Sequence, residues 1–557
     1  MLRLRMSMSS RSGGFYNVIG ANEIRYRFTK NNRYRNREIL NRITAYFNIT
    51  NKRISENNIA VFQGELRKLG FINAKVLFEG HHLCHAASAY YCSPYPSDLI
   101  ITCDGKGGED SFVFYEPDEQ DGLKVLHRID YKASIGQFYS CITQLLGFRP
   151  TRHEGKITGL AAYGKPGPLL EKFSERFYEG ENLRRFPHGQ VEEMIQEYKT
   201  EKSISLKERI NLRTSESDIG YRYGLNAKIV LAWLRDITTG YRMEDIAYAA
   251  QYVTEQVIVS ECNRIYEKHF SGRQLGVALA GGVFANVRVN QRIYELPWVN
   301  KIFVQPAMGD SGISMGAAIL TDIRESRRDP LTRQYAFRHT YWGPNYDGDV
   351  DTFIESINRR IFDCERMGNP AKQVARIIAD NGIVGFWHGA MEWGPRALGQ
   401  RSIILNTFNR DVNKTLNDRL HRTEFMPFAP SVVDYKAKEY FPGYDPDVPA
   451  ADYMTITYDV KEQHRDRLQA VTHVDGTARP QVVRRNTNPY FYDIISEFEK
   501  LTGCGAIVNT SFNAHEEPIV STPAVALRAL ETRCVDQLVL NEYLISLKTG
   551  KPRVRGS

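Results

Sequence analysis

The chain has 557 residues, which is too long for one hydrophobic core of ordinary size, so we expect two or three domains. It is 42% hydrophobic and 25% charged, as in soluble globular proteins, and its apolar runs are too short to predict a transmembrane helix. The net charge of +8 suits an anionic substrate but is too dilute to indicate nucleic-acid binding. Its eight cysteines form no CxxC pair, and scattered cysteines are typical of a reducing compartment, so we expect a cytoplasmic location.

The first half of the chain alternates strands and helices. The predicted elements are a strand at 75–78, a helix at 81–91, a strand at 98–103, a hairpin at 112–115 and 125–129, and helices at 133–146, 157–162 and 244–269. Two further strands, 276–280 and 301–305, each lead through a glycine turn into a helix. Such repeated units predict an α/β fold with ligands at the strand ends. The charged region 167–240 is expected to be a helical insertion or lid.

A change in composition at 325–352 indicates a domain boundary, which we place after residue 345. The predicted domains are therefore 1–345 and 346–557. The second begins with a helix at 371–381 and a strand at 383–386, and it ends with a helix at 523–532.

The motif EGHHLCHAASAYY places two histidines four residues apart on the first predicted helix. Residues i and i+4 share a helix face, so His81 and His85 can both point at one ion. Further ligands are needed, and Asp104 and Asp310 each follow a predicted strand, where a carboxylate is well placed to coordinate. The alternative is a pair of hydrogen-bonded core histidines.

Two glycine turns follow predicted strands and open helices, in GGVFAN and GDSG. Backbone amides at such turns bind phosphate, which makes Gly281, Gly282, Asn286, Gly309 and Gly312 candidate nucleotide contacts. Close packing would explain a single turn equally well.

A lysine in HEGKITG is another candidate phosphate contact. Lys156 lies beside a glycine, and the alternative is an ordinary surface lysine.

Arginines gather at loop positions in the second half of the chain. Arg396, Arg401, Arg422 and Arg479 together would bind a small dianion such as an acyl phosphate, and Asn509 offers an uncharged hydrogen bond. Individually, each arginine would be explained by a surface position or a salt bridge.

Taken together, the motifs resemble those of the NodU/CmcH-type O-carbamoyltransferases over roughly residues 75–545. The resemblance rests on EGHHLCHAASAYY, DGKGGED, HEGKITGLAAYG, LAGGVFANVRVNQRI, PAMGDSGISMGAA, EWGPRALGQRSI, MPFAPSV, HVDGTARPQ and NTSFNAHEEPIV, in the family's order. It implies an actin-like ATPase (ASKHA) domain followed by an α+β YrdC-like domain. It also implies that carbamoyl phosphate and ATP give a carbamoyl-adenylate, whose carbamoyl group passes to a hydroxyl of a sugar or secondary metabolite.

The resemblance also implies roles for the candidate residues. In the family the HxxxH pair and two aspartates hold iron or a similar divalent ion, which here gives His81, His85, Asp104 and Asp310; Mg²⁺ is a further candidate ion. The arginines that neutralise carbamoyl phosphate would be Arg396, Arg401 and Arg479, with Asn509 beside them. The nucleotide contacts would be Lys156, the two glycine turns and Arg422. The implied partners are carbamoyl phosphate, a hydroxyl acceptor and a second copy in a homodimer, with no nucleic acid and no membrane.

Three positions depart from the family pattern. The HD-S/G-A motif of the family's first strand has no convincing match, so the first strand is expected to be missing. Met426 stands where many relatives have arginine, and Ala514, His515 and Glu516 stand where relatives often have Arg-Gly. Two alternatives therefore stay open: a tRNA N6-threonylcarbamoyl transferase-like enzyme, and a degenerate nucleotide-binding relative without catalysis.

Overall fold

The chain divides into two compact units, Met1–Ala336 (unit 1) and Phe337–Ser557 (unit 2). The computed structural model describes residues 5–7, 63–73, 77–179, 182–183, 225–420, 425, 427–515 and 517–548. The division falls within the segment 325–352 whose composition changes, shortly before the expected position after residue 345.

Unit 1 is built on a five-stranded sheet in the order β5–β4–β3–β8–β9. Its strands are β3 (Leu99–Gly107), β4 (Asp110–Asp118), β5 (Gly122–Asp130), β8 (Leu275–Ala280) and β9 (Val299–Val304). The strands β3, β8 and β9 run parallel, whereas β4 and β5 form the predicted antiparallel hairpin. Every residue of β8 is buried, as expected for a parallel strand covered on both faces.

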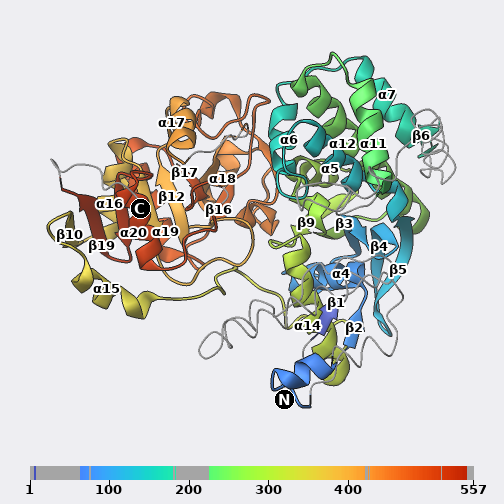
Figure 1. Ribbon diagram of the computed structural model, residues 1–557, viewed down its shortest axis with the longest axis horizontal. Helices are drawn as coiled ribbons and strands as arrows, with labels where there is room; N and C mark the ends of the chain where they lie inside the picture. Colours follow the sequence, from blue (N-terminus) through green and yellow to red (C-terminus); the bar gives the residue numbers. More distant parts are fainter. Residues whose placement is uncertain are drawn as a thin grey trace. The chain divides into compact units, whose positions relative to one another are not determined.

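Helices cover both faces of this sheet. In Figure 1, α4 and α14 pack together on one side, and α5, α6 and α12 lie on the other. The helices of unit 1 are α4 (His81–Cys92), α5 (Ile135–Leu145), α6 (Glu154–Ala161), α7 (Pro168–Phe177), α11 (Leu225–Ile237), α12 (Met243–His269), α13 (Val287–Tyr294) and α14 (Ile313–Glu325). Most of the expected insertion 167–240 lies outside the described residues, apart from α7, α11 and short adjoining segments.

Several elements of unit 1 differ from the sequence-based expectation at their ends, and three of these differences have a visible cause or partner. The strand expected at 75–78 is β2 (Leu77–Glu79), which pairs in parallel with a short strand β1 (Arg5–Ser7) in a sheet of its own. The strand β3 continues past the expected end because Gly107 still pairs with Asp110 of the hairpin. The helix α6 begins three residues early because the Glu154 carboxylate accepts the amide of Thr151 ahead of its first turn.

Unit 2 is built on an eight-stranded mixed sheet in the order β10–β19–β18–β11–β12–β17–β13–β16. Its strands are β10 (Phe362–Arg366), β11 (Val384–Trp387), β12 (Arg401–Leu405), β13 (Ala429–Val433), β16 (Gln481–Val483), β17 (Ala506–Ser511), β18 (Gln537–Leu540) and β19 (Tyr543–Leu547). Its longer helices are α16 (Pro370–Ala379), α17 (Asp411–Arg419), α19 (Pro489–Thr502) and α20 (Pro523–Glu531), of which α16 and α19 pack together.

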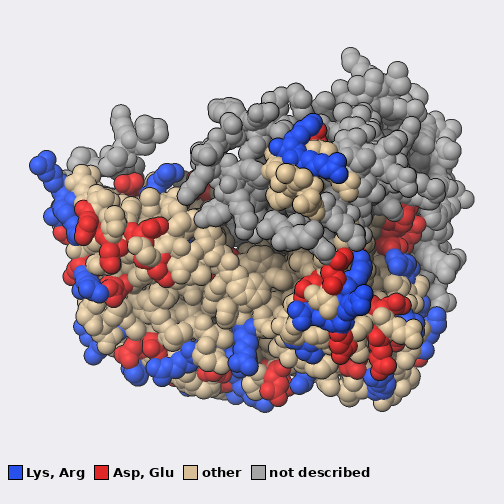
Figure 2. All heavy atoms as spheres, turned by 90° about the horizontal axis from the view of Figure 1, so that it is seen from below, with Lys and Arg blue, Asp and Glu red and all other residues tan. Residues whose placement is uncertain are grey.

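Both units are thus mixed α/β structures, which confirms the predicted class at that level. Among the described residues, no helix is both long and apolar enough to span a membrane. Figure 2 shows one face of the molecule, on which lysine and arginine are interspersed with aspartate and glutamate over the described surface. On the part of this face that the structure describes, the positive charges therefore do not gather into one patch.

Candidate functional site

Four candidate metal ligands come together at one edge of the unit 1 sheet. His81 is the first residue of α4 and His85 follows one turn later, so both imidazoles leave the same side of the helix. Asp104 lies on β3, and Asp310 follows β9 in the turn that leads into α14. Because β3, β8 and β9 are parallel neighbours, their carboxyl ends meet at this edge, which brings the two aspartates to the helix.

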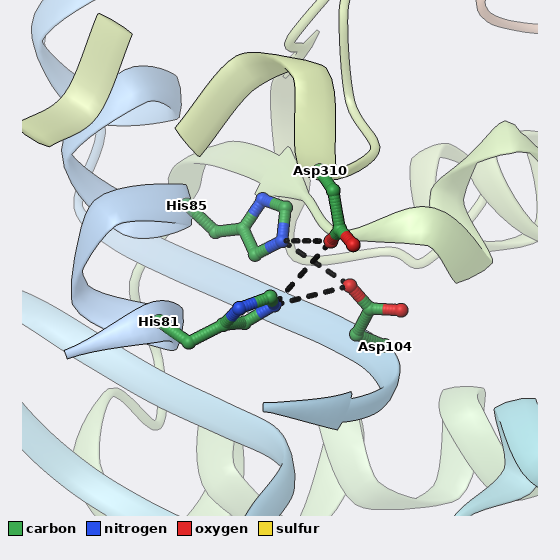
Figure 3. Close-up of side chains that lie close together, drawn as sticks. All are labelled: His81, His85, Asp104 and Asp310. Carbon is green, nitrogen blue, oxygen red and sulfur yellow. Dashed lines mark hydrogen bonds and ion pairs between the residues drawn. The ribbon is translucent and has the colours of Figure 1, made fainter. Parts of the chain in front are cut away.

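The two histidines face both carboxylates through the same ring nitrogen (Figure 3). His85 Nε2 lies 3.2 Å from Asp104 Oδ2 and 3.6 Å from Asp310 Oδ1. His81 Nε2 lies 3.3 Å and 3.5 Å from the same two oxygens. The four ligand atoms all lie within 4.8 Å of one another.

These distances fit a shared cation. Two ligand atoms that are each about 2.1 Å from one ion are separated by roughly 3.4 Å in tetrahedral coordination, close to the four nitrogen–oxygen distances here. Two imidazoles and two carboxylates form a mixed nitrogen–oxygen set that suits iron, zinc and similar ions. The residues therefore fit the divalent metal that the sequence predicted.

The electrostatics of the cluster are strongly coupled. Burial alone would lower the pKa of His85, but hydrogen bonds and charges from Asp104 and Asp310 outweigh it and raise that pKa to about 9. Burial would raise the pKa of Asp104, and the two histidines hold it well below its usual range instead. The raised pKa of His85 favours a protonated ring that pairs with the two carboxylates.

His82 lies on another face of α4 and has a different environment. Its Nδ1 is 2.8 Å from Thr102 Oγ1, and its Nε2 is 3.2 Å from the carbonyl oxygen of Asp110. Burial, followed by the neighbouring histidines, lowers the pKa of His82 to about 3, so its ring is neutral. These bonds are typical of a histidine with a structural role.

The two glycine turns lie at the same edge, after β8 and β9. Gly281 has φ +110°, and a Cβ there would lie 2.1 Å from the carbonyl oxygen of Cys103, so only glycine fits against β3. A Cβ on Gly282 would lie 3.1 Å from Asp104 Oδ1, which places this turn directly beside the metal cluster. Gly312 packs against the backbone of Ala307, whereas a Cβ on Gly309 would meet open space. Gly282 and Gly309 thus keep the edge accessible.

Asn286 and Lys156 are both held inside unit 1. The Asn286 side chain caps α13 by accepting the amide of Val289, and its Nδ2 donates to Gln251 Oε1 at 2.8 Å. Lys156 lies on α6 and is 5% exposed, with its ammonium 5.8 Å from the centre of the Phe148 ring. The nucleotide contacts predicted for these two residues stay predictions.

In unit 2, Arg396 lies in the loop 388–400 between β11 and β12, which we call the arginine loop. Arg396 and Arg479 are partly buried side chains. Arg401, the first residue of β12, is 0% exposed and its guanidinium donates to the carbonyls of His388, Gly389 and Gln400. Its bonds are thus directed at backbone, whereas the sequence predicted an anion.

Asn509 lies on β17 and is hydrogen-bonded to the arginine loop and to neighbouring strands. Its Nδ2 donates to the carbonyl of Ala397 at 3.2 Å, to Ser431 Oγ at 3.0 Å and to Gln481 Oε1 at 2.9 Å. The residue is 1% exposed. Asn509 therefore supports the arginine loop from beneath; its predicted contact with substrate is untested.

Three of the predicted or departing positions, Arg422, Met426 and Glu516, lie outside the described residues. The structure also brings forward a residue that the sequence reasoning missed. Glu392 is 7% exposed, and its carboxylate accepts three backbone amides of the arginine loop and β12. In the sequence, the only available signal for this role was a glutamate among the glycine, proline and apolar residues of EWGPRALGQRS.

Comparison with known proteins assigns the class. A family model described as carbamoyltransferase N-terminus matches residues 21–319, and one described as carbamoyltransferase C-terminus matches 375–547. The chain therefore belongs to the carbamoyltransferase family and is a transferase enzyme. This confirms the resemblance to the NodU-type family on which the sequence-based interpretation rests.

Its relatives include nodulation proteins. NolNO of Sinorhizobium fredii is 31% identical over 86% of this chain and 65% of its own length. NolO of Bradyrhizobium diazoefficiens is 30% identical over 84% of this chain and 78% of its own. An uncharacterized protein of Methanocaldococcus jannaschii is 32% identical over 88% of this chain and 76% of that protein.

Among solved structures, full-length HypF in its phosphate- and nucleotide-bound form is 19% identical over 32% of this chain and 22% of that one. The TM-score of 0.24 is too low to inform the fold.

Proposed function

We propose that this enzyme is an O-carbamoyltransferase that makes a carbamoyl-adenylate from carbamoyl phosphate and ATP. It then transfers the carbamoyl group to a hydroxyl of a sugar or another metabolite. The observation that carries the proposal is the cluster of His81, His85, Asp104 and Asp310 beside the glycine turns at one sheet edge. A metal-binding cluster next to accessible backbone amides suits a nucleotide with its phosphates.

The proposal divides the chemistry between the two units. Unit 1 would be an actin-like ATPase domain, which is supported by its parallel strands that lead through glycine turns into helices. Unit 2 would be a YrdC-like domain that accepts carbamoyl phosphate, which is supported by the loop that carries Arg396. The family membership supports the reaction class for the chain as a whole.

The reaction needs three steps, in each of which one bond forms and another breaks. Carbamoyl phosphate gives up its phosphate to water and leaves carbamate, which is a poor electrophile. A carbamate oxygen then bonds to the α-phosphorus of ATP, and pyrophosphate leaves. The acceptor hydroxyl finally bonds to the carbamoyl carbon and loses its proton, and AMP leaves.

The residues of unit 2 would act in the first of these steps. The guanidiniums of Arg396 and Arg479 would bind the phosphate oxygens and stabilise the charge that develops as the phosphate leaves. The separated carbamate would be kept in place because both arginines also attract its carboxylate.

The residues of unit 1 would hold the nucleotide and the ion. His81, His85, Asp104 and Asp310 would hold Fe²⁺ or a similar divalent ion, and Mg²⁺ would accompany ATP. When bound, the ion supplies a Lewis acid for phosphate or carbonyl oxygens. The backbone amides near Gly282 and Gly309 would orient the phosphates at the same edge.

The test is pyrophosphate exchange. The purified, metal-loaded enzyme should move radiolabel from pyrophosphate into ATP only when carbamoyl phosphate is present. Exchange that does not depend on carbamoyl phosphate, or its absence, would contradict the proposed activation step.

A second assay tests the acceptor. A panel of hydroxylated sugars and metabolites is offered with carbamoyl phosphate and ATP, and products are detected by a carbamoyl mass increase. A product on tRNA alone would favour the threonylcarbamoyl transferase-like alternative.

A further inference from the structure

The arginine loop is an irregular segment whose shape must be fixed from outside. Residues 388–400 form neither helix nor strand, so their amides and carbonyls lack the partners that regular structure supplies. Buried backbone groups of this kind need side-chain partners. Some partners are backbone groups, as where the His388 amide donates to the Gln400 carbonyl. Others are side chains, among which Glu392 and Arg401 each make several bonds to the loop and its ends.

Glu392 gathers the amides of the loop's second half. Its Oε1 accepts from the amide of Leu398 at 2.7 Å, of Gln400 at 2.8 Å and of Arg401 at 3.2 Å. The amide of Gly399, which lies between two of these residues, donates to Ser402 Oγ at 3.0 Å. The buried carboxylate of Glu392 thus holds the segment that follows Arg396 in a compact turn.

Side chains from other elements hold the carbonyls of the same stretch. Gln481 Nε2 donates to the carbonyl of Leu398 at 2.8 Å, and Asn509 Nδ2 donates to that of Ala397. Asn488 Nδ2 donates to the carbonyl of Gly399 at 3.3 Å. The segment that follows Arg396 is therefore bonded on both its amide and its carbonyl sides.

Arg401 supports the other end of the loop. Its guanidinium donates to the carbonyls of His388 at 2.7 Å and Gly389 at 3.0 Å, and it lies 4.0 Å from the centre of the Trp387 ring. Burial lowers the pKa of Arg401 to about 10, and the negative charge of Glu392 is the strongest influence that opposes this shift. The two buried charges therefore compensate each other within one loop.

We infer that Glu392 and Arg401 are positioning residues, which hold the backbone around Arg396 in the shape that presents its guanidinium to carbamoyl phosphate. This inference rests on the proposed function. It gives Arg401 a role in place of the substrate contact expected from the sequence, because its bonds are already directed at the loop's carbonyls.

Two variants of Glu392 separate positioning from charge alone. Glu392→Gln keeps an acceptor oxygen of the same reach, whereas Glu392→Ala leaves the three amides without their partner. We expect Glu392→Ala to raise the KM for carbamoyl phosphate on the order of 100-fold, as for a misplaced binding group, with the KM for ATP little changed. Glu392→Gln should recover most of that loss, and exposed Glu365→Gln should behave as wild type.

Hydrogen exchange gives a readout that does not need activity. The amides of Leu398, Gln400 and Arg401 should lose protection in Glu392→Ala and keep most of it in Glu392→Gln. If wild type shows no exchange of pyrophosphate that depends on carbamoyl phosphate, the proposed function fails, and amide protection alone still decides whether Glu392 organises the loop.

Other results would overturn the inference. A Glu392→Ala enzyme with unchanged KM for carbamoyl phosphate, or with both substrate KM values raised equally, would show that Glu392 does not position Arg396. Unchanged amide protection would show the same. Should Glu392→Ala not fold, Glu392→Asp, whose shorter side chain does not reach the three amides, and Arg401→Lys decide: wild-type amide protection and wild-type KM for carbamoyl phosphate in both would refute the inference.

Discussion

His85 and Asp104 form a buried pair in which each residue changes the charge state of the other. Their closest atoms, Nε2 and Oδ2, lie 3.2 Å apart, and the His85 side chain is fully buried. The carboxylate raises the pKa of the imidazole to about 9, and the imidazoles hold the pKa of the carboxyl well below its usual range. The site is therefore organised as a charged cluster before any ion enters.

The first prediction concerns metal retention. His85→Ala removes a candidate ligand that lies close to both carboxylates. The affinity of the protein for the metal should therefore fall more than about 100-fold, and the rate of carbamoyl transfer should fall with it. Metal content after dialysis, measured by mass spectrometry, checks the first effect. The control is His269→Ala, which changes an exposed histidine at the end of α12. Full transfer by a metal-free His85→Ala enzyme would contradict a role for the ion.

The second prediction is a pH dependence of the metal-free protein. Folding raises the pKa of His85 from its ordinary 6.5 to about 9, so the folded state binds a proton more tightly than the unfolded state. This contribution is fully present below pH 6.5 and is lost as the pH rises through 9, with a limit of about 3 kcal/mol in the free energy of unfolding. Thermal unfolding in a chelator across this window measures it. The metal-loaded protein should show a weaker slope, and an equal slope would contradict the assignment.

The third prediction contrasts two glycines in the turns after β8 and β9. Gly281→Ala would push a Cβ into the carbonyl of Cys103 at φ +110°, so it should lower the free energy of unfolding by more than about 2 kcal/mol. Gly309→Ala meets no neighbouring atom and should unfold like wild type, while raising the KM for ATP by crowding the phosphates. Unfolding curves and ATP kinetics test the pair. A Gly309→Ala enzyme with an unchanged KM would place the nucleotide elsewhere.

The fourth prediction separates the two halves of the reaction. Arg396→Ala should abolish pyrophosphate exchange that depends on carbamoyl phosphate, because the phosphate loses its bidentate partner. The same variant should still transfer from carbamoyl-adenylate supplied in the assay. Arg528→Ala, an exposed position on α20, is the matched control. Equal loss of both steps would argue against chemistry divided between the units.

That His81, His85, Asp104 and Asp310 lie together was predictable, because each step of the prediction follows from a general rule of chain geometry. Two histidines at i and i+4 must share a helix face, and aspartates that follow parallel strands must meet at one edge. The second rule also requires both strands to lie in one parallel sheet, which the repeated strand, glycine turn and helix units predicted. The hairpin β4–β5 and the long helix α12 were predictable because their periodicity lies within the segment itself.

The arginines were harder to assign because a guanidinium looks the same in sequence whether it binds a ligand or a carbonyl. The role of Arg401 follows from its burial against Trp387 and from its three carbonyl acceptors, all of which depend on how the loop folds back. Glu392 was missed for a related reason, since a carboxylate that accepts amides within an irregular loop has no periodic pattern.

The candidate metal ligands come from α4 and β3, which follow one another in the chain, and from the turn after β9, which lies far along the chain from both. An ion bound there would act as a cross-link between the beginning and the end of unit 1, much as a disulfide restricts an unfolded chain. Metal supply would then govern how long the protein resists proteolysis as well as how fast it catalyses its reaction. A cell short of the metal would contain less of the enzyme, even with its gene fully expressed.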